Sequence, residues 1–324
     1  MTAIPLKRFA HCNVNCSSLT RSRAFYTDVV GLRAFSHTNP PLQRGGGFPM
    51  PPGEDAELQW DAWILHDHRG PAASPAVDLL EWKTPTPTGV PYPSANHLGF
   101  YRLCYLVPSV AEMHQRFLDA GAIVLSPPAT AWLDEARTQP VEVFCGLDPD
   151  GTCLEFVQND VVPSTQSVHV NVNCSDLAHS RDWYIANLGF EVNGTSAPGP
   201  QPGGAFGYPG DCEWEAAFLT LPGQRGTFTI DLLQWRRPTP VGRPYTTANH
   251  LGIYRMAFMV DDIHACYETL VANGVACSSP PVGLDMGPDI PVDRLWALFF
   301  TDPDGTCLEL IEEPTRQATP AGAP

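Results

Sequence analysis

The chain has 324 residues, a formal net charge of −16, and 43% hydrophobic and 17% charged residues. This length favours two domains, and the composition is typical of a folded globular protein rather than a disordered one. The acidic balance argues against nucleic-acid binding, and no apolar run approaches the roughly 18 residues that a membrane span needs. The N-terminal segment lacks an apolar signal core, so we expect a cytoplasmic protein whose ten cysteines are buried thiols.

The predicted elements follow the same order in both halves of the chain. In the first half, alternating residues over 11–16 predict a strand with His11, Asn13 and Asn15 on one face. A helix follows, which begins after Ser17 or Ser18 and is closed by Gly31. The remaining predicted elements are strands near 58–66 and 76–82, a strand over 101–107, a helix between Ser109 and Gly121, and strands near 141–145 and 152–157.

The second half of the chain repeats the motifs of the first. HCNVNCS at 11–17 returns as HVNVNCS at 169–175, and DPDGTCLE at 148–155 returns at 302–309. A repeat of this length exceeds the roughly 20–50 residues of a solenoid unit, so it predicts two copies of one domain. The predicted units are an N-terminal domain over 1–160, a C-terminal domain over 161–313, a disordered tail over 314–324, and four strand–helix–strand modules near 8–83, 98–158, 166–236 and 251–312.

Ionisable residues recur at equivalent strand positions of the four modules. The first strand of each module carries a His or an Arg, and the last strand carries a carboxylate. An unpaired carboxylate in an apolar strand is costly to bury, so we expect the His and Arg residues to be its partners. These residues are His11, Arg102, His169 and Arg255 on the first strands, and Asp78, Glu155, Asp231 and Glu309 on the last strands.

The order of these motifs resembles the vicinal oxygen chelate superfamily, which includes glyoxalase I, extradiol dioxygenases, fosfomycin-resistance enzymes and bleomycin-binding proteins. The opening His, the Ser-Arg-x-Phe/Trp-Tyr helix and the closing Asp-Pro-Asp-Gly-x-x-Leu-Glu carry this resemblance to about residue 313. It implies an α+β fold of four βαβββ modules that form two glyoxalase-like domains, with U-shaped mixed sheets around a cavity. Each cavity then combines one His/Asp module with one Arg/Glu module, whether modules pair within a half or across halves.

The resemblance also implies a divalent metal ion, such as Zn, Mn, Fe or Ni, in each cavity. Arg102 and Arg255 stand where the family usually has His or Gln, and a guanidinium cannot donate a lone pair to a metal. In one interpretation, each Arg lies beside the metal as a catalytic residue and holds an anionic substrate oxygen. In the other, the Arg replaces the ion and pairs with the carboxylates. By position, the implied metal ligands are His11, Asp78, Glu155, His169, Asp231 and Glu309.

Two functions follow from these interpretations. The first is a metal-assisted isomerase or lyase that transforms a small oxygenated metabolite. The second is a metal-free protein that binds and sequesters an antibiotic-like small molecule, as bleomycin-resistance proteins do. We expect a small molecule as the partner, no nucleic acid or membrane, and a monomer or homodimer. The predicted substrate-binding residues are Asn13 and Asn171, which face the same way as the His residues, and Trp60 and Trp214, which with Phe48 and Phe206 supply aromatic walls.

Overall fold

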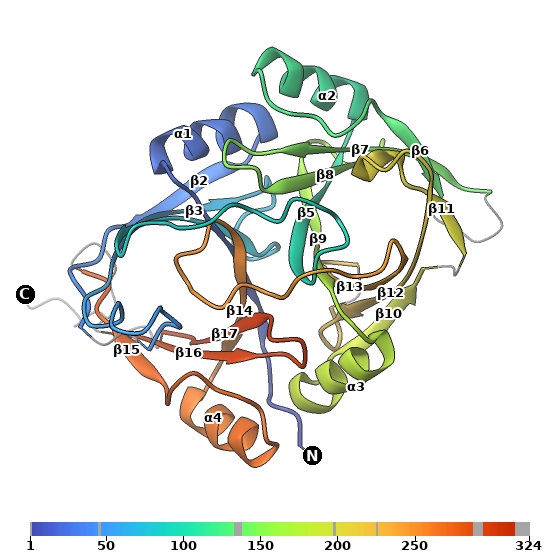
Figure 1. The fold of residues 1–324 in the computed structure, drawn as a ribbon. Helices are drawn as coiled ribbons and strands as arrows, with labels where there is room; N and C mark the ends of the chain where they lie inside the picture. The colour runs from blue at the N-terminus through green and yellow to red at the C-terminus, as the bar shows by residue number, and fades with distance from the viewer. Residues whose placement is uncertain are drawn as a thin grey trace, which may run out of the picture.

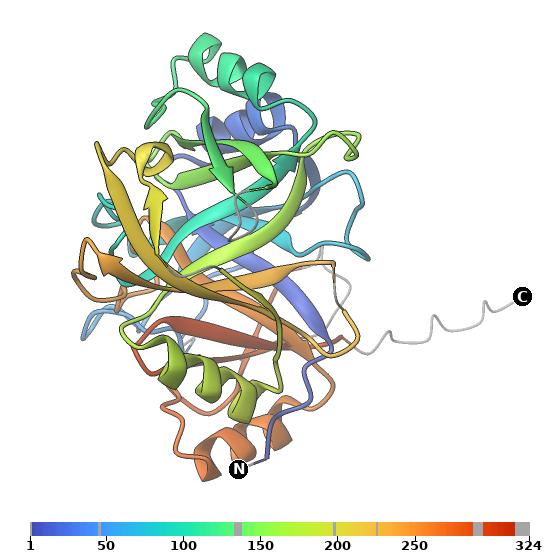
Figure 2. The same ribbon diagram turned by 90° about the vertical axis from the view of Figure 1, so that its right-hand side faces the viewer.

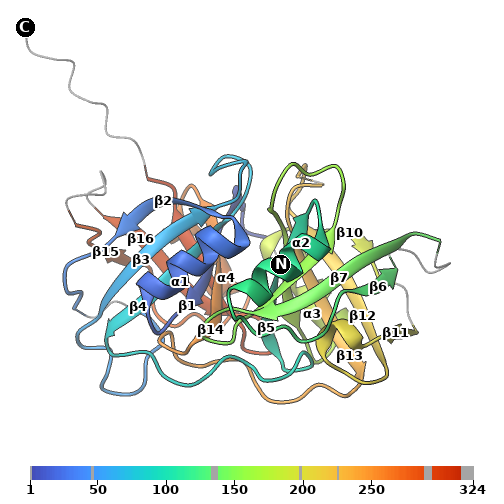
Figure 3. The same cartoon turned by 90° about the horizontal axis from the view of Figure 1, so that it is seen from above.

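Two curled mixed sheets lie side by side and form the body of the protein (Figure 3). The computed structural model describes residues 2–44, 47–132, 138–196, 199–224, 226–287 and 294–314. It confirms the α+β class and the two glyoxalase-like sheets. The predicted tail lies outside the described residues except for Pro314. Within the described part of the chain, no helix is long and apolar enough to cross a membrane.

The first sheet combines strands from the two ends of the chain. In spatial order its strands are β15 (Val282–Leu284), β16 (Leu295–Thr301), β17 (Cys307–Glu312), β14 (Gly252–Val260), β1 (Arg8–Asn15), β4 (Ala76–Thr84), β3 (Gln59–His66) and β2 (Arg33–Thr38).

The second sheet is built from the middle of the chain. Its order is β10 (Glu191–Thr195), β12 (Asp211–Thr220), β13 (Thr229–Arg237), β9 (Gln166–Asn173), β5 (Gly99–Val107), β8 (Cys153–Gln158), β7 (Pro140–Leu147) and β6 (Ala129–Trp132), with β11 (Pro200–Pro202) paired to β12.

Modules therefore pair across the two halves of the chain. The first module joins the fourth through the antiparallel pair β1 and β14, in which Asn13 lies opposite Arg255. The second module joins the third through β5 and β9, in which Cys104 lies opposite His169. The predicted domain boundaries at 160 and 313 separate the two sequence repeats. Each sheet combines strands from both repeats, so these boundaries stay predictions.

Helices cover both ends of the pair of sheets. The helices α1 and α2 lie at one end, and α3 and α4 lie at the opposite end (Figures 1 and 2). Their bounds, with those of two further helical segments, are α1 (Leu19–Ala24), the π-helical η1 (Phe25–Val30), α2 (Val110–Asp119), α3 (Leu177–Leu188), the 3-10 turn η2 (Gly204–Phe206) and α4 (Ile263–Ala272).

The two sheets share one apolar core. The ring of Phe9 on β1 lies 5.2 Å from that of Phe228, which precedes β13, and 5.7 Å from that of Phe258 on β14. This core takes one face of each sheet. The other faces are hollow, and smaller apolar clusters line them. The core therefore holds one face of each sheet in place, and the polar residues lie on the opposite face of the same strands.

The predicted helix near residues 17–31 is confirmed as the continuous pair α1 and η1. Ser18 caps its start by accepting a hydrogen bond from the backbone N–H of Arg21. Gly31 ends it in the left-handed region at φ 91°, where a side chain would strain the backbone. The sequence pattern predicts no element at β2 or β6, because both are edge strands with few fully buried residues and little apolar alternation.

The predicted turn at Asp148–Gly151 joins the second module to the helix of the first. Asp148 Oδ1 accepts hydrogen bonds from the backbone N–H groups of Asp150 and Thr152, at 2.9 and 2.8 Å. Its Oδ2 accepts the hydroxyl of Tyr26 at 3.1 Å. Asp302 repeats this arrangement with Tyr184. Burial raises the pKa of both Asp148 and Asp302 to about 6.

These two carboxylates make stability depend on pH. Because their folded-state pKa lies above the ordinary value of 3.8, the folded protein binds their protons more tightly than the unfolded chain does. Their unfavourable contribution to stability is absent below about pH 4 and complete above about pH 6, where it is on the order of 3 kcal/mol for each group.

The double variant D148N/D302N removes both titrating groups but keeps the Oδ1 atoms that accept hydrogen bonds from the backbone of the turns. We expect it to gain stability over the wild type at pH 7.5 and to lose most of that advantage at pH 4.

Thermal unfolding midpoints of both proteins across this pH range measure the effect. A constant difference between the two proteins at all pH values would contradict the assigned titration.

Candidate functional site

Each sheet encloses one cavity at the junction of its two modules. The cavity in the first sheet, cavity A, has a volume of about 290 Å³, and the cavity in the second sheet, cavity B, has a volume of about 240 Å³. Both contain the predicted combination of one His, one Asp, one Arg and one Glu. The sets are His11, Asp78, Arg255 and Glu309 in cavity A, and His169, Asp231, Arg102 and Glu155 in cavity B.

In cavity A the guanidinium bridges the two carboxylates. Arg255 Nε donates to Glu309 Oε2 at 2.7 Å, and its Nη2 donates to Asp78 Oδ2 at 3.1 Å. His11 Nε2 lies 3.2 Å from Glu309 Oε2 and 3.7 Å from Asp78 Oδ2. Arg255 is 4% exposed, so this pairing is buried rather than a surface contact.

Cavity B repeats the arrangement almost atom for atom. Arg102 Nε donates to Glu155 Oε2 at 2.8 Å, and its Nη2 donates to Asp231 Oδ2 at 2.7 Å. His169 Nε2 lies 3.2 Å from Glu155 Oε2 and 3.9 Å from Asp231 Oδ2. The structure thus brings the eight predicted ionisable residues together as two sets of four, each drawn from both halves of the chain.

The electrostatics of each set keep its glutamate charged. Burial alone would raise the pKa of Glu155, but the charge of Arg102 and then the hydrogen bond to His169 outweigh burial and hold this pKa well below its usual range. Burial, Arg255 and His11 act in the same senses on Glu309, whose pKa is also lowered. By formal charge, with the imidazole counted as neutral, each set has one guanidinium and two carboxylates.

Each set keeps polar atoms that lack a partner. Arg102 Nη1, Arg255 Nη1 and Asp231 Oδ1 are buried and have no hydrogen-bond partner within the described residues. Buried polar atoms in folded proteins nearly always have a partner, from the protein, from water or from a ligand. Both arginines line their cavities, so an oxygen-bearing molecule can supply the missing acceptor.

The predicted substrate-binding residues take two different positions. Trp60 lines cavity A and Trp214 lines cavity B, each close to a Phe ring, so the aromatic walls are present. Asn13 is fully buried behind the site, where its Nδ2 donates to the backbone oxygen and to Oδ2 of Asp78 at 3.2 Å. Asn171 holds Asp231 in the same way. This geometry gives the asparagines a positioning role and no wall of either cavity.

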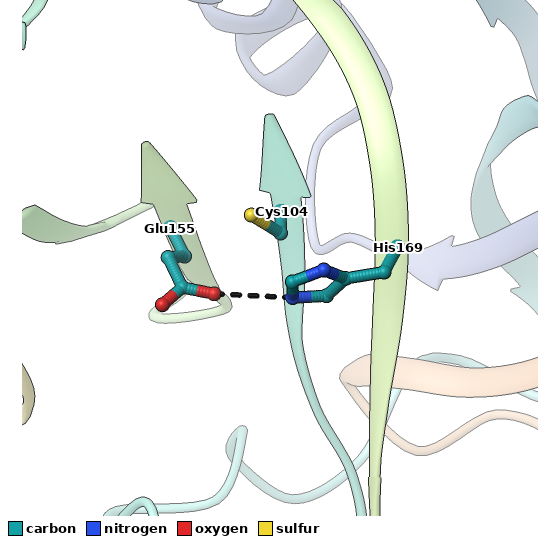
Figure 4. Close-up of side chains that lie close together, drawn as sticks. All are labelled: Cys104, Glu155 and His169. Carbon is teal, nitrogen blue, oxygen red and sulfur yellow. Dashed lines mark hydrogen bonds and ion pairs between the residues drawn. The ribbon is translucent and has the colours of Figure 1, made fainter. Parts of the chain in front are cut away.

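The implied metal sets of His, Asp and Glu do not converge. Among the described residues, a single group of three candidate ligands has its atoms within 4.8 Å of one another, and it is Cys104, Glu155 and His169 in the second sheet (Figure 4). The carboxylates of Asp and Glu are instead separated by the guanidinium that both of them bind. The fit to a metal ion is therefore poor for the implied sets and good for the set that contains Cys104.

Cys104 was missed as a site residue because a cysteine in an apolar strand is typical of a packed core. The available signal was its spacing, since it lies two residues after Arg102 on β5 and thus on the same strand face. In the register of the first sheet, Ala257 lies opposite His11 where Cys104 lies opposite His169 in the second. Of the two sheets, the second therefore has a thiol at this position and the first does not.

The outer walls of the cavities also differ. Arg8 and His66 line cavity A, whereas neutral polar residues such as Thr195 and Gln201 line cavity B. Burial lowers the pKa of His66, so its imidazole is neutral at pH 7. Arg8 lines cavity A and lies 3.5 Å from Glu313, and the described residues that line cavity B contain no counterpart to it.

Comparisons with known proteins agree with this architecture. A sequence model of the Glyoxalase/Bleomycin resistance protein/Dioxygenase superfamily matches residues 8–156 and 166–310. The uncharacterised protein YaeR of Escherichia coli is 30% identical over 145 residues, which cover 45% of this chain and 94% of YaeR.

Several solved structures resemble nearly the whole chain, among them the following two. Glyoxalase I from Zea mays is 17% identical with a TM-score of 0.64, over 94% of this chain and 92% of that one. A putative dioxygenase from Bacillus subtilis is 15% identical with a TM-score of 0.60, over 97% of this chain and 87% of that one. At these identities the likeness to both structures concerns the fold alone.

Removing one buried guanidinium is expected to be strongly destabilising. R255M leaves Asp78 and Glu309 buried without their cation, and we expect a loss of about 3–5 kcal/mol in the free energy of unfolding. The exposed pair of Arg236 and Glu215 provides the control, since R236M should cost less than about 1 kcal/mol. Adding D78N and E309Q to R255M should restore part of the loss. Urea unfolding measures all variants, and equal losses for R255M and R236M would contradict the buried pairing.

Proposed function

Because the chain belongs to the glyoxalase/bleomycin resistance protein/dioxygenase superfamily, we propose that it is an enzyme that acts on a small oxygenated metabolite by an isomerase- or lyase-type reaction. The observation that carries this proposal is the Arg–carboxylate–His set, which recurs at the wall of both cavities. A purely structural ion pair needs no imidazole beside it, and an imidazole beside a carboxylate is a common group for proton transfer.

The arginine is the group that binds a substrate oxygen. Its Nε and Nη2 are engaged by the carboxylates, while Nη1 of Arg102 and of Arg255 lacks an acceptor among the described residues. A carbonyl, carboxylate or enolate oxygen that accepts from Nη1 would be stabilised as it gains negative charge, and the apolar aromatic walls strengthen that interaction by excluding water.

The imidazole and its carboxylate partner form the proton-transfer pair. His169 Nε2 and Glu155 Oε2 share a hydrogen bond, as do His11 Nε2 and Glu309 Oε2, both at 3.2 Å. A proton removed from the carbon next to the substrate carbonyl passes to this pair. Its return to a neighbouring carbon gives an isomerisation, and its delivery to a leaving group gives an elimination. A divalent metal ion, where bound, would act as a Lewis acid on the same substrate oxygen.

Sequestration without chemistry is the second candidate. The observation that favours it is the enclosure of each guanidinium by aromatic rings, with Arg102 Cζ 5.0 Å from the ring centroid of Phe206 and Arg255 Cζ 5.7 Å from that of Phe48. Such a cavity suits a flat molecule that is held by stacking and by one hydrogen bond. Under this candidate the bound molecule leaves the cavity unchanged.

Solvent hydrogen exchange separates the two candidates. We expect the protein in D2O to exchange the C–H next to the carbonyl in members of a panel of small 2-oxo acids, hydroxy ketones and aldehydes, followed by proton NMR. The double variant R102K/R255K keeps a buried positive charge but removes the Nη1 donor, and it should lose at least about 100-fold of this rate, since each arginine stabilises the developing oxyanion. H11Q/H169Q should lose a comparable factor, and R236M should retain the wild-type rate.

Tryptophan fluorescence, which reports on Trp60 and Trp214 in the cavity walls, measures binding of the same panel. Binding without exchange or conversion would favour sequestration, and exchange that is equal in the wild type and R102K/R255K would contradict the proposed site.

A further inference from the structure

We propose that the second sheet, unlike the first, binds one divalent metal ion of the thiolate-preferring kind, such as Zn²⁺, through Cys104, Glu155 and His169, of which Glu155 and His169 line cavity B. The inference goes beyond the proposed function, because metal binding is measured without substrate. It gives a ligand role to Cys104, which neither proton transfer nor an ion pair explains.

Neighbouring strands place the three side chains in one row. Cys104 on β5 lies opposite Glu155 on the parallel strand β8 and opposite His169 on the antiparallel strand β9. Figure 4 shows the sulfur, a carboxylate oxygen and an imidazole nitrogen converging from these three strands. Their ligand atoms all lie within 4.8 Å of one another.

The spacing suits a small tetrahedral ion. Bonds of about 2.0–2.3 Å from Zn²⁺ to nitrogen, oxygen and sulfur place the ligand atoms about 3.3–3.8 Å apart. The His169 and Glu155 atoms are already 3.2 Å apart, and the Cys104 sulfur lies within 4.8 Å of the other ligand atoms, so it needs to approach them by at most about 1.3 Å. The fourth position is left to water or to a ligand in the cavity.

Charge explains why the thiol matters beside an arginine. In cavity A, a divalent ion would add two positive charges to Arg255, opposed by the two carboxylates, which leaves the buried site with a net charge of +1. In cavity B, burial raises the pKa of the free Cys104 thiol, but a thiol that binds the ion loses its proton, and the resulting thiolate brings the sum to zero. An uncompensated buried charge is expensive, so the thiolate supplies what the imidazole and carboxylates alone cannot.

A partnerless atom in cavity B supports the same assignment. Asp231 is 2% exposed, and its Oδ1 has no hydrogen-bond partner among the described residues, although its Oδ2 binds Arg102. A metal-bound water in the cavity would donate to such an acceptor. This atom is independent of the cysteine, and a buried acceptor without a partner is rare in a folded protein.

Cavity A is a control built into the same chain. It reproduces the 3.2 Å approach of His and Glu, and it carries Ala257 at the position of the thiol. The alternative explanation of Cys104 is simple core packing, since nine other cysteines are present and most are buried. Packing alone predicts that exchanging cysteine and alanine between the two sheets does not change metal binding.

Cobalt provides the probe for this test. The full chain is freed of metal with a chelator under reducing conditions and titrated with Co²⁺, and a thiolate-to-cobalt charge-transfer band is followed in the near ultraviolet. We expect one equivalent to bind with this band in the wild type. C104A has the alanine that the first sheet carries at this position, and it should lose the band. Its affinity for Zn²⁺, measured by competition, should fall at least 100-fold, while its circular dichroism stays unchanged.

Two further variants make the test decisive. H169Q keeps the thiol and should weaken Co²⁺ binding at least 10-fold, whereas H11Q should leave it unchanged. A257C should gain a second equivalent with the same band. A wild-type protein without the band, a band that persists in C104A, or a folded A257C that binds one equivalent would each overturn the proposal. If the wild type binds Co²⁺ as expected but exchanges no hydrogen of the substrate panel, only the proposed function would be contradicted.

Discussion

A guanidinium held between two buried carboxylates is the constraint on which both cavities depend. In cavity A, Arg255 and Glu309 come from the fourth module and Asp78 comes from the first, so the ion pair crosses the seam between modules. Burying any of these charges alone is unfavourable, and the three are stable only together. The contact between the modules and the candidate site therefore coincide, because the ion pair that joins the two modules also forms the polar wall of the cavity.

This constraint changes the chemistry that the fold offers. A carboxylate engaged by an arginine is a weaker donor to a metal ion, and the two carboxylates of each set are kept apart by the group that binds them. The imidazole remains free of the arginine and contacts the Glu carboxylate instead. Where no thiol stands beside the set, as in cavity A, an arginine at this position therefore converts a set of metal ligands into a cationic oxygen-binding site with an adjacent proton-transfer pair.

The sequence predicted the composition of the sites better than their construction. The repeated motifs and the strand alternation located the eight ionisable residues and the glyoxalase-like fold, because buried carboxylates in apolar strands require partners. The pairing across halves could not be predicted, because β5 and β14 carry the same repeated motif. Sequence alone therefore does not tell which of these two strands pairs with β1. Cys104 was not predicted because residue type alone does not distinguish a packed thiol from one beside a histidine.

The pairing of modules across the chain has a consequence for how the two cavities differ. A protein with a single repeat can form this cross-paired arrangement only with a second identical copy of itself, and its two cavities are then the same by symmetry. Joining the repeats in one polypeptide removes that symmetry, so a change at one position reaches one cavity only. Cys104 against Ala257, together with Arg8 at the wall of cavity A, shows this freedom in use. One chain thereby gains two chambers that are free to specialise separately.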